Sequence, residues 1–476
     1  MRSHFLAIDF GTTSTKSALL DLEDGAFVGL ERRSDGGPAL AGSGRGGIQR
    51  HELSLPQLLQ RFDDICHRAW EITHFDGIVL CSEMHGFVVV SEMGEPQTNY
   101  VSWLDARSTE QIDGISTHDL IVEELGDDFR RLTGMRPRPG FPLLNLAHTG
   151  RTGELTTDGW ALSLPCALAR LTHDGMREEA IFEHPTMLAA MALADVEAQA
   201  TPAPRLLDLV HEIGQCRIRV GAPSGEGQIA GHWRSREGLI PIYAGVGDHQ
   251  CSVLGASPEP KMDANLNLGT GSQVGIVDGP LDDAFELRPY FDSRHLTAIT
   301  HIPAGRALNE FVGFLEAIAR FAGATGDFWG ALATVTPEQV QDAALAVDLS
   351  IFEGARGWTD GGSIRQIVEG SLDVEEYLAA VLAAFTRQYV DVLAEVDAPR
   401  QLQRLLLSGG IARRLPQLRH ILAKAMPYDV QPAADLDESL LGLRCLALHA
   451  AGRAASVCDA AEIFQRQCVL RDEPIA

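Results

Sequence analysis

Residues 6–22 read LAIDFGTTSTKSALLDL. Two apolar runs flank a short turn rich in glycine and hydroxyl side chains, which is the pattern of a β-hairpin. Residues 265–279, NLNLGTGSQVGIVDG, repeat this arrangement with a Gly-Thr-Gly-Ser turn between two apolar runs. The two turns lie about half a chain apart, so we interpret them as a weak internal repeat in which each copy opens one domain.

The composition is that of an acidic globular protein. The chain has 476 residues, of which 45% are hydrophobic and 22% are charged, and this length suits two domains. Its 39 basic and 65 acidic residues give a formal net charge of −26. Such a surface repels polyanions, so we expect no nucleic-acid partner. The only lysines among the basic residues are Lys16, Lys261 and Lys424.

The cysteines and the apolar segments favour the cytoplasm. The eight cysteines form no CxxC pair and no zinc-type spacing with histidine, so reduced thiols are the simplest interpretation. The N-terminal segment leads into a short strand ending at Asp9, and it is too short and too acidic for a signal peptide. No run approaches about 18 apolar residues. We therefore expect a soluble cytoplasmic protein without a membrane partner.

The two hairpin turns have the chemistry of phosphate-binding loops, although no Walker or GxGxxG motif is present. Glycines let the backbone approach a phosphate closely, while N–H groups and hydroxyls donate hydrogen bonds to it. Asp9 precedes the first turn, where a carboxylate can hold Mg²⁺ through water. Either turn by itself is also compatible with a plain tight hairpin. The residues expected at phosphate are Gly11, Thr12, Thr13, Ser14, Lys16, Gly269, Thr270, Gly271 and Ser272.

Lys16 has two interpretations. A compact ammonium suits a position close to phosphates better than a guanidinium fork does. Its side chain can equally point to a solvated strand face.

The rest of the chain predicts further strands and helices. Residues 77–90 are strand-like, and residues 240–256 predict a strand, a glycine loop and a helix, which places a domain border near Ala244. Residues 374–396 have apolar side chains at helical spacing. We therefore expect an N-terminal domain over 1–244, a C-terminal domain over 245–457 and a C-terminal extension over 458–476. The glycine-rich residues 36–47 are expected to form a flexible connection.

Five stretches, taken in order, resemble the FGGY carbohydrate kinases. They are DFGTTSTK from Asp9, SEMHG from Ser82, WLDARS from Trp103, the pair GVGDHQ from Gly245 and LNLGTGS from Leu266, and SGGIARR from Ser408. The resemblance covers about residues 5–455. It implies an α/β fold in which two actin-like (ribonuclease H-like) ATPase domains flank a catalytic cleft. It also implies ATP and Mg²⁺ as cofactors and a sugar as the second substrate.

Within this resemblance Asp248 takes the role of general base. A sugar hydroxyl is a weak nucleophile, and a carboxylate that accepts its proton assists in-line phosphoryl transfer. The alternative for an aspartate after a glycine loop is a helix N-cap.

The resemblance also assigns a sugar site and an adenosine site. The sugar site comprises Glu83, Met84, His85, Trp103, Asp105, Arg107 and Asp248. Charged groups make directional hydrogen bonds to hydroxyls, and Trp offers an apolar face. His85 can instead be structural, and Met84 can belong to the core. The adenosine site comprises Gly409, Gly410 and Gly442, of which the first two also suit an ordinary strand-to-helix turn.

Substrate choice within the family is the least constrained prediction. Glu83 stands where the ketose kinases usually have Gln, which adds a negative charge beside the sugar site. PYFDSRHLTAI from Pro289 and GRALNEFVGFL from Gly305 resemble sedoheptulokinase, so sedoheptulose, giving sedoheptulose 7-phosphate, is the leading acceptor. Xylulose, ribulose, erythritol and glycerol remain alternatives, as do a non-catalytic sugar or nucleotide sensor and an actin-like ATPase. A homodimer is one possibility for the oligomeric state.

Overall fold

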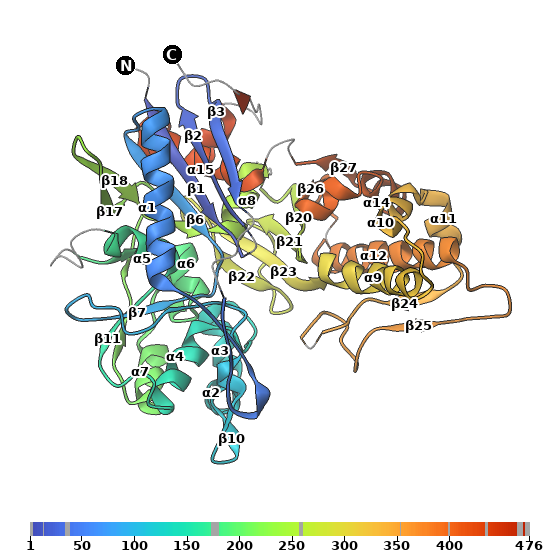
Figure 1. Cartoon of the computed structure of the whole chain (residues 1–476), viewed down its shortest axis with the longest axis horizontal. Helices are drawn as coiled ribbons and strands as arrows, with labels where there is room; N and C mark the ends of the chain where they lie inside the picture. Colours follow the sequence, from blue (N-terminus) through green and yellow to red (C-terminus); the bar gives the residue numbers. More distant parts are fainter. Residues whose placement is uncertain are drawn as a thin grey trace. The chain divides into compact units, whose positions relative to one another are not determined.

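The computed structural model describes residues 3–12, 14–33, 39–172, 180–256, 260–352, 354–397, 400–433, 437–463 and 470–471. The chain divides into two compact units (Figure 1). The first comprises Met1–Ser257, Leu287–His295 and Leu436–Ala476, and the second comprises Pro258–Glu286 and Leu296–Asp435.

The first unit contains a mixed sheet. Its strands, in spatial order, are β17 (Ile229–Arg234), β18 (Leu239–Tyr243), β6 (Gly77–Ser82), β1 (His4–Phe10), β2 (Thr15–Asp21), β3 (Phe27–Arg33) and β28 (Leu470–Arg471), with β19 (Val246–Gly247) also paired to β6. Strands β1, β2 and β3 form an antiparallel meander, whereas β6 runs parallel to β1 and β18 runs parallel to β6. Three antiparallel strands followed by two parallel ones give the ribonuclease H-like order.

The two faces of β1 have different surroundings because side chains alternate along a strand. Leu6, Ile8 and Phe10 join a hydrophobic core with α1 and α5. Asp9 faces the other way and meets α15. Figure 1 shows α1 along this sheet and α15 beside β1. The helices next to the sheet are α1 (Leu55–Ile72), α5 (Leu164–Leu171), α8 (Asp248–Ala256), α15 (Glu438–Ala450) and α16 (Val457–Ile463).

A second hydrophobic core of the first unit lies around β7, β11 and several helices. The helices are α2 (Thr117–Leu125), α3 (Asp127–Thr133), α4 (Pro142–Arg151), α6 (Pro185–Ala190) and α7 (Pro204–Gly214). The shorter strands are β4 (Ala39–Ser43), β5 (Gln49–Leu53), β7 (Val88–Ser91), β8 (Tyr100–Val101), β9 (Gln111–Ile112), β10 (Ile115–Ser116), β11 (Gly159–Leu162), β12 (Phe182–Glu183), β13 (Ala194–Asp195), β14 (Thr201–Pro202), β15 (Ile218–Arg219) and β16 (Ala222–Pro223). The short helix η1 (Arg45–Gly47) precedes β5, and η2 (Arg107–Thr109) precedes β9.

The second unit repeats the strand order of the first. Its sheet runs β23 (His295–Pro303), β21 (Gly271–Val277), β20 (Asp263–Leu268), β26 (Arg404–Ser408) and β27 (Asp429–Pro432). Strand β21 runs antiparallel to both β20 and β23. Strand β26 runs parallel to both β20 and β27. The internal repeat that the two turns predict is therefore confirmed at the level of topology.

Helices complete the second unit around one apolar core. They are α9 (Gly305–Phe321), α10 (Phe328–Thr334), α11 (Pro337–Asp342), α12 (Val374–Val396), α13 (Gly410–Arg414) and α14 (Leu418–Ala425). The remaining strands are β22 (Glu286–Pro289), where the chain passes between the units, β24 (Ala346–Asp348) and β25 (Ser363–Arg365). The predicted helix over 374–396 is confirmed as α12.

The units divide the chain at other positions than the predicted border at 244/245. Helix α8 belongs to the first unit because it packs tightly on α15, where a Cβ at Gly255 would lie 1.8 Å from the Glu438 carbonyl oxygen. The described part of the predicted extension, α16 and β28, also belongs to this unit, and β28 pairs with β3. Part of the predicted connection over 36–47 is the strand β4, paired with β5.

Within the described residues, no helix is long and apolar enough to cross a membrane.

Candidate active site

Three carboxylates follow neighbouring strands of the first unit. Asp9 lies at the end of β1, Glu83 follows β6, and Asp248 follows β19. Strands β1 and β19 both run parallel to β6, and the three strand ends are in register, with Asp9 beside Cys81 and Gly247 beside Ser82. The carboxyl ends of parallel strands are where ligands bind in open α/β sheets.

Asp9 is buried and held through one of its two oxygens. Lys16 Nζ lies 2.8 Å from Asp9 Oδ2, and the Ser439 hydroxyl lies 2.6 Å from the same oxygen. Asp9 Oδ1 is also buried, and it has no hydrogen-bond partner among the described residues. A buried carboxylate oxygen without a donor needs a partner of another kind, such as an ion or a water molecule.

Lys16 bridges two carboxylates, with Nζ 2.8 Å from Asp9 Oδ2 and 2.9 Å from Asp437. Burial lowers the pKa of the ammonium, but the charges and hydrogen bonds of Asp9 and Asp437 outweigh it and hold the pKa above its ordinary value. The side chain therefore does not lie on a solvated face. The ammonium charge is paired with Asp9 and Asp437, and the contact of Lys16 with phosphate stays a prediction.

Asp248 is the first residue of α8, and its side chain is partly buried. Its Oδ1 accepts a hydrogen bond at 2.8 Å from the backbone N–H of His249, the next residue, whereas an N-cap side chain accepts from two or three residues ahead. Burial, followed by the negative charges of Asp9 and Glu83, raises the pKa of Asp248 to about 7. A carboxylate with this pKa is a stronger base than an ordinary aspartate.

Glu83 is buried beside these two carboxylates. Its backbone N–H donates to the Phe10 carbonyl at 2.9 Å, which ties the end of β6 to the end of β1. Burial raises the pKa of Glu83, and the nearby polar groups of Thr12, Tyr100 and Ser102 offset part of that increase. Glu83 Oε1 and the Tyr100 hydroxyl are buried without a hydrogen-bond partner among the described residues.

Met84 and His85 pack against α6. Met84 forms a buried cluster with Met187 and Ala190, and a Cβ at Gly247 would lie 2.9 Å from its sulfur. His85 has a left-handed backbone, with φ of 63°, and its Nδ1 lies 2.7 Å from the Ala190 carbonyl oxygen. The geometry agrees with core packing for Met84, while His85 is only partly buried.

Trp103, which the sequence predicts in the sugar site, contacts the first turn. Its indole Nε1 donates to the Thr12 hydroxyl at 3.1 Å. Gly11 closes the same turn through its N–H to the Ser14 carbonyl at 3.2 Å. Thr13, also predicted at phosphate, lies outside the described residues.

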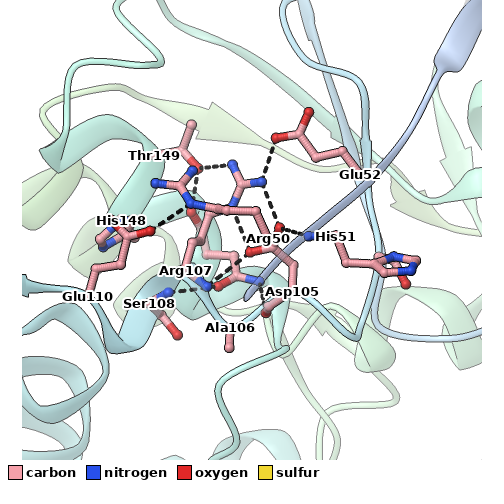
Figure 2. Close-up of polar contacts among 12 residues, drawn as sticks. Arg50, His51, Glu52, Asp105, Ala106, Arg107, Ser108, Glu110, His148 and Thr149 are labelled. Atoms are coloured by element: carbon pink, nitrogen blue, oxygen red, sulfur yellow. Dashed lines mark hydrogen bonds and ion pairs between the residues drawn. The ribbon is translucent and has the colours of Figure 1, made fainter. Parts of the chain in front are cut away.

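Asp105 and Arg107 form a buried ion pair (Figure 2). Arg107 Nε lies 2.8 Å from Asp105 Oδ1, and Nη2 lies 2.9 Å from Oδ2. Asp105 also accepts from the His51 N–H at 2.7 Å, and Arg107 Nη2 reaches Glu52 at 2.6 Å. Because these groups already bond to one another and both side chains are at most 1% exposed, their predicted contact with sugar is not supported.

The rest of this network joins β5 to α4 and to the segment after η2. Arg50 Nε donates to Glu110 at 2.7 Å, and its two terminal nitrogens contact Glu154 at 2.9 and 3.0 Å. His148 lies 3.6 Å from Glu110. Figure 2 shows Arg50 and Arg107 with Glu52, Asp105 and Glu110. The arrangement supports the loop that carries Trp103.

The second unit brings its own predicted residues together. Gly269 N–H donates to Gly271 at 3.0 Å, and Arg306 N–H donates to the Thr270 carbonyl at 2.8 Å. The Ser272 hydroxyl lies 2.7 Å from the Tyr389 hydroxyl, so it is used within the unit. Gly409 follows β26, which pairs in parallel with β20, so the turn and this glycine lie at the same edge.

Two of the predicted adenosine glycines, Gly409 and Gly442, lie where the packing leaves no room for a side chain. Gly409 has φ of 92°, and a Cβ there would lie 2.5 Å from the Leu268 carbonyl oxygen. Gly410 begins α13. Gly442 belongs to the first unit, where a Cβ would lie 2.0 Å from the Cys251 carbonyl oxygen. Gly442 therefore allows α15 to pack against α8, a role that the adenosine prediction did not include.

Asp437, Ser439 and Tyr100 contribute to the site but were not predicted. Asp437 and Ser439 come at the start of α15, and an Asp or Ser before a helix usually indicates only a cap. Tyr100 lies in a strand and has the pattern of a core residue. Their proximity to Asp9 and Glu83 has no local signal in the sequence.

The described residues contain no group of three or more His, Cys, Asp or Glu placed to hold a metal ion. The free oxygen of Asp9 nevertheless fits Mg²⁺ bound to nucleotide, which keeps most of its waters and needs one or two carboxylates.

Residues 4–148, from β1 to most of α4, match the sequence model of the FGGY family of carbohydrate kinases, N-terminal domain. Over these residues the chain is similar to the FGGY family. A comparison with curated proteins gave no match.

Solved structures of this family have the same fold. Gluconate kinase from Lactobacillus acidophilus aligns with a TM-score of 0.78 and 16% identity, covering 100% of this chain and 94% of its own. Xylulose kinase from the same organism gives 0.77 and 16%, covering 99% and 94%. Plasmodium falciparum glycerol kinase with ADP gives 0.74 and 15%, covering 99% and 94%. At these identities the likeness establishes the two-domain actin-like fold of the FGGY kinases.

Proposed function

We propose that this FGGY carbohydrate kinase transfers the γ-phosphoryl group of ATP to a hydroxyl of a neutral sugar or polyol, with Asp248 as the general base. The observation that carries the proposal is Asp248 at the end of β19, where burial and the charges of Asp9 and Glu83 raise its pKa to about 7. Such a carboxylate is well matched to proton abstraction near neutral pH.

In this reaction the acceptor oxygen attacks the γ-phosphorus while its proton passes to Asp248, and the bond to the leaving ADP breaks. Asp9, through its free oxygen, is the residue that would hold Mg²⁺ through water. The ion would supply charge neutralisation for the triphosphate. In the first turn the backbone N–H of Thr12, and in the second turn that of Thr270, would donate to phosphate oxygens, since the N–H groups of Gly11 and Gly269 already close their own turns. The adenosine would lie against Gly409 and Gly410.

The acceptor is proposed to be uncharged. Asp9, Glu83 and Asp248 converge at one sheet edge, and the neighbouring Lys16 is already paired with two carboxylates. A sugar acid would meet this negative charge, whereas hydroxyls can donate to Glu83 and Asp248. Sedoheptulose heads the acceptors to be tested, and the likeness to xylulose and glycerol kinases supports including those compounds. We place the reaction in the cytoplasm, where ATP is supplied.

A coupled ADP-release assay over sedoheptulose, xylulose, ribulose, erythritol, glycerol and gluconate tests both parts. We expect turnover with at least one neutral compound and none with gluconate. Turnover with gluconate alone would reject the neutral acceptor. Nucleotide binding without turnover on any compound in a wider panel would favour a sensor.

Asp248→Asn tests the base. We expect a loss of about 10²- to 10⁴-fold in kcat with ATP binding retained, whereas the exposed control Asp128→Asn keeps normal turnover. Near-normal kcat in Asp248→Asn would overturn the assignment.

A further inference from the structure

Asp437 occupies the N-cap position of α15 without capping the helix. Its side chain makes no capping hydrogen bond to the first turn, although Asp is a preferred residue for that purpose. Its carboxylate instead contacts Lys16 Nζ at 2.9 Å, Arg32 Nη2 at 2.8 Å and the Ser439 hydroxyl at 2.7 Å. These three contacts lie on β2, on β3 and at the second residue of its own helix.

Ser439 stands between two carboxylates. Its hydroxyl oxygen lies 2.6 Å from Asp9 Oδ2 and 2.7 Å from Asp437 Oδ1. A hydroxyl has one hydrogen to donate, so Ser439 donates to one carboxylate at a time. Since Lys16 Nζ also contacts both carboxylates, Asp9, Lys16, Asp437 and Ser439 form a closed ring of polar contacts.

The ring acts on one oxygen of Asp9 only. Both Lys16 and Ser439 bind Oδ2, and Oδ1 has no partner among the described residues. Lys16, and Ser439 when its hydroxyl donates to Asp9, restrict rotation of the carboxylate through Oδ2, and Oδ1 keeps its lone pairs for another ligand. Asp437 and Arg32 also balance the charges, because two carboxylates and two basic side chains meet in this group.

We propose that Asp437 and Ser439 are positioning residues for Asp9, which fix its orientation toward the nucleotide-bound cation, and that Lys16 serves this ring rather than the phosphates. The inference rests on the proposed function for the role of Asp9. If Asp437 becomes neutral, Lys16 has Asp9 as its remaining acidic partner and competes with the cation for it. If Ser439 loses its hydroxyl, Oδ2 loses one of its two donors.

The variants Asp437→Asn, Ser439→Ala and Ser439→Thr test the proposal, with Mn²⁺ plus a non-hydrolysable ATP analogue as the probe. Free Mn²⁺ is measured by electron paramagnetic resonance, which reads cation binding without turnover. We expect the affinity for Mn²⁺ to fall about tenfold in Asp437→Asn, as is typical when a partner of a metal-binding carboxylate is removed. The fall in Ser439→Ala should be smaller, and Ser439→Thr should restore affinity because it keeps the hydroxyl.

Steady-state kinetics supply a second readout. The concentration of Mg²⁺ needed for half-maximal rate should rise in parallel with the loss of Mn²⁺ affinity, while KM for the acceptor stays unchanged. If Asp437 had a purely structural role, Asp437→Asn would lower the unfolding temperature and leave both the Mn²⁺ affinity and the Mg²⁺ requirement unchanged.

Asp373→Asn is the matched control. Asp373 caps α12 in the ordinary way, accepting from the Glu376 N–H at 2.8 Å. This substitution should leave both stability and Mn²⁺ affinity nearly unchanged, because Asn caps a helix about as well as Asp. Mn²⁺ affinities equal to wild type in folded Asp437→Asn and Ser439→Ala would overturn the inference. That outcome leaves the kinase proposal standing, whereas failure of the kinase proposal would appear as absent turnover in the wild-type protein.

Discussion

The first unit places Asp9 opposite Lys16 across β1 and β2, whereas the second unit places Asn267 opposite Gln273 across β20 and β21. Both positions precede a glycine turn in sheets of the same strand order. The backbone arrangement is therefore shared, but the charges are confined to the first unit. The repeat therefore supplies two similar turns, and the proposed cation and base chemistry depends on side chains present in one copy.

Asp9→Asn gives the first unit the residue type that Asn267 provides at the matching position of the second unit. This substitution should have the largest effect on turnover. We expect kcat to fall about 10²- to 10³-fold, because a charge that would hold the cation is removed. The matched change, Asn267→Ala, should cost less than about tenfold. Equal losses in the two variants, measured by ADP release, would remove the distinction between the copies.

Arg107→Met tests whether the buried network supports the site without contacting sugar. Asp105 would remain buried without its ion-pair partner, and breaking a buried pair costs about 3–5 kcal/mol. Urea unfolding should show this loss of free energy of unfolding, while KM for the acceptor in the remaining folded protein stays near wild type. A large rise in KM at unchanged stability would restore the sugar-contact role.

Lys16→Met should lower the free energy of unfolding by about 3 kcal/mol, because Asp9 and Asp437 lose their shared cation. Gln273→Met in the matching position of the second unit should change it by less than about 1 kcal/mol. Similar shifts of the unfolding temperature in Lys16→Met and Gln273→Met would contradict a special role for the charges of the first unit.

Close to pH 7 the pH dependence of the rate should show the smallest effect. Asp248 must be deprotonated to accept a proton, and its pKa of about 7 lies above that of an ordinary aspartate. The rate should therefore fall about tenfold for each pH unit below 7 and level off above it. Because Glu83 contributes to this pKa, Glu83→Gln should move the midpoint to lower pH. A profile that stays flat between pH 5 and 7 would contradict Asp248 as the base.

The local patterns of the sequence predicted much of the fold. Alternating or continuous apolar runs around residues 6–22 and 265–279 gave both hairpins, and apolar spacing gave α12 with its observed bounds. The domain border predicted near Ala244 differs from the division of the structure. The reason is that α8 packs on α15, although the two helices lie about 190 residues apart in the chain. Local periodicity carries no record of such a contact.

The site divides in the same way. The sequence predicted Asp9 as a cation ligand from its place before the first turn, and the resemblance to the FGGY kinases predicted Asp248 as the base and Glu83 in the sugar site. Three contacts follow from the fold alone: Lys16 binds Asp9 and Asp437, Asp105 and Arg107 bind each other, and Gly442 lets α15 pack closely on α8. The physical reason is that a motif fixes the chemistry of a side chain. Its hydrogen-bond partners and its desolvation depend on residues brought together by folding.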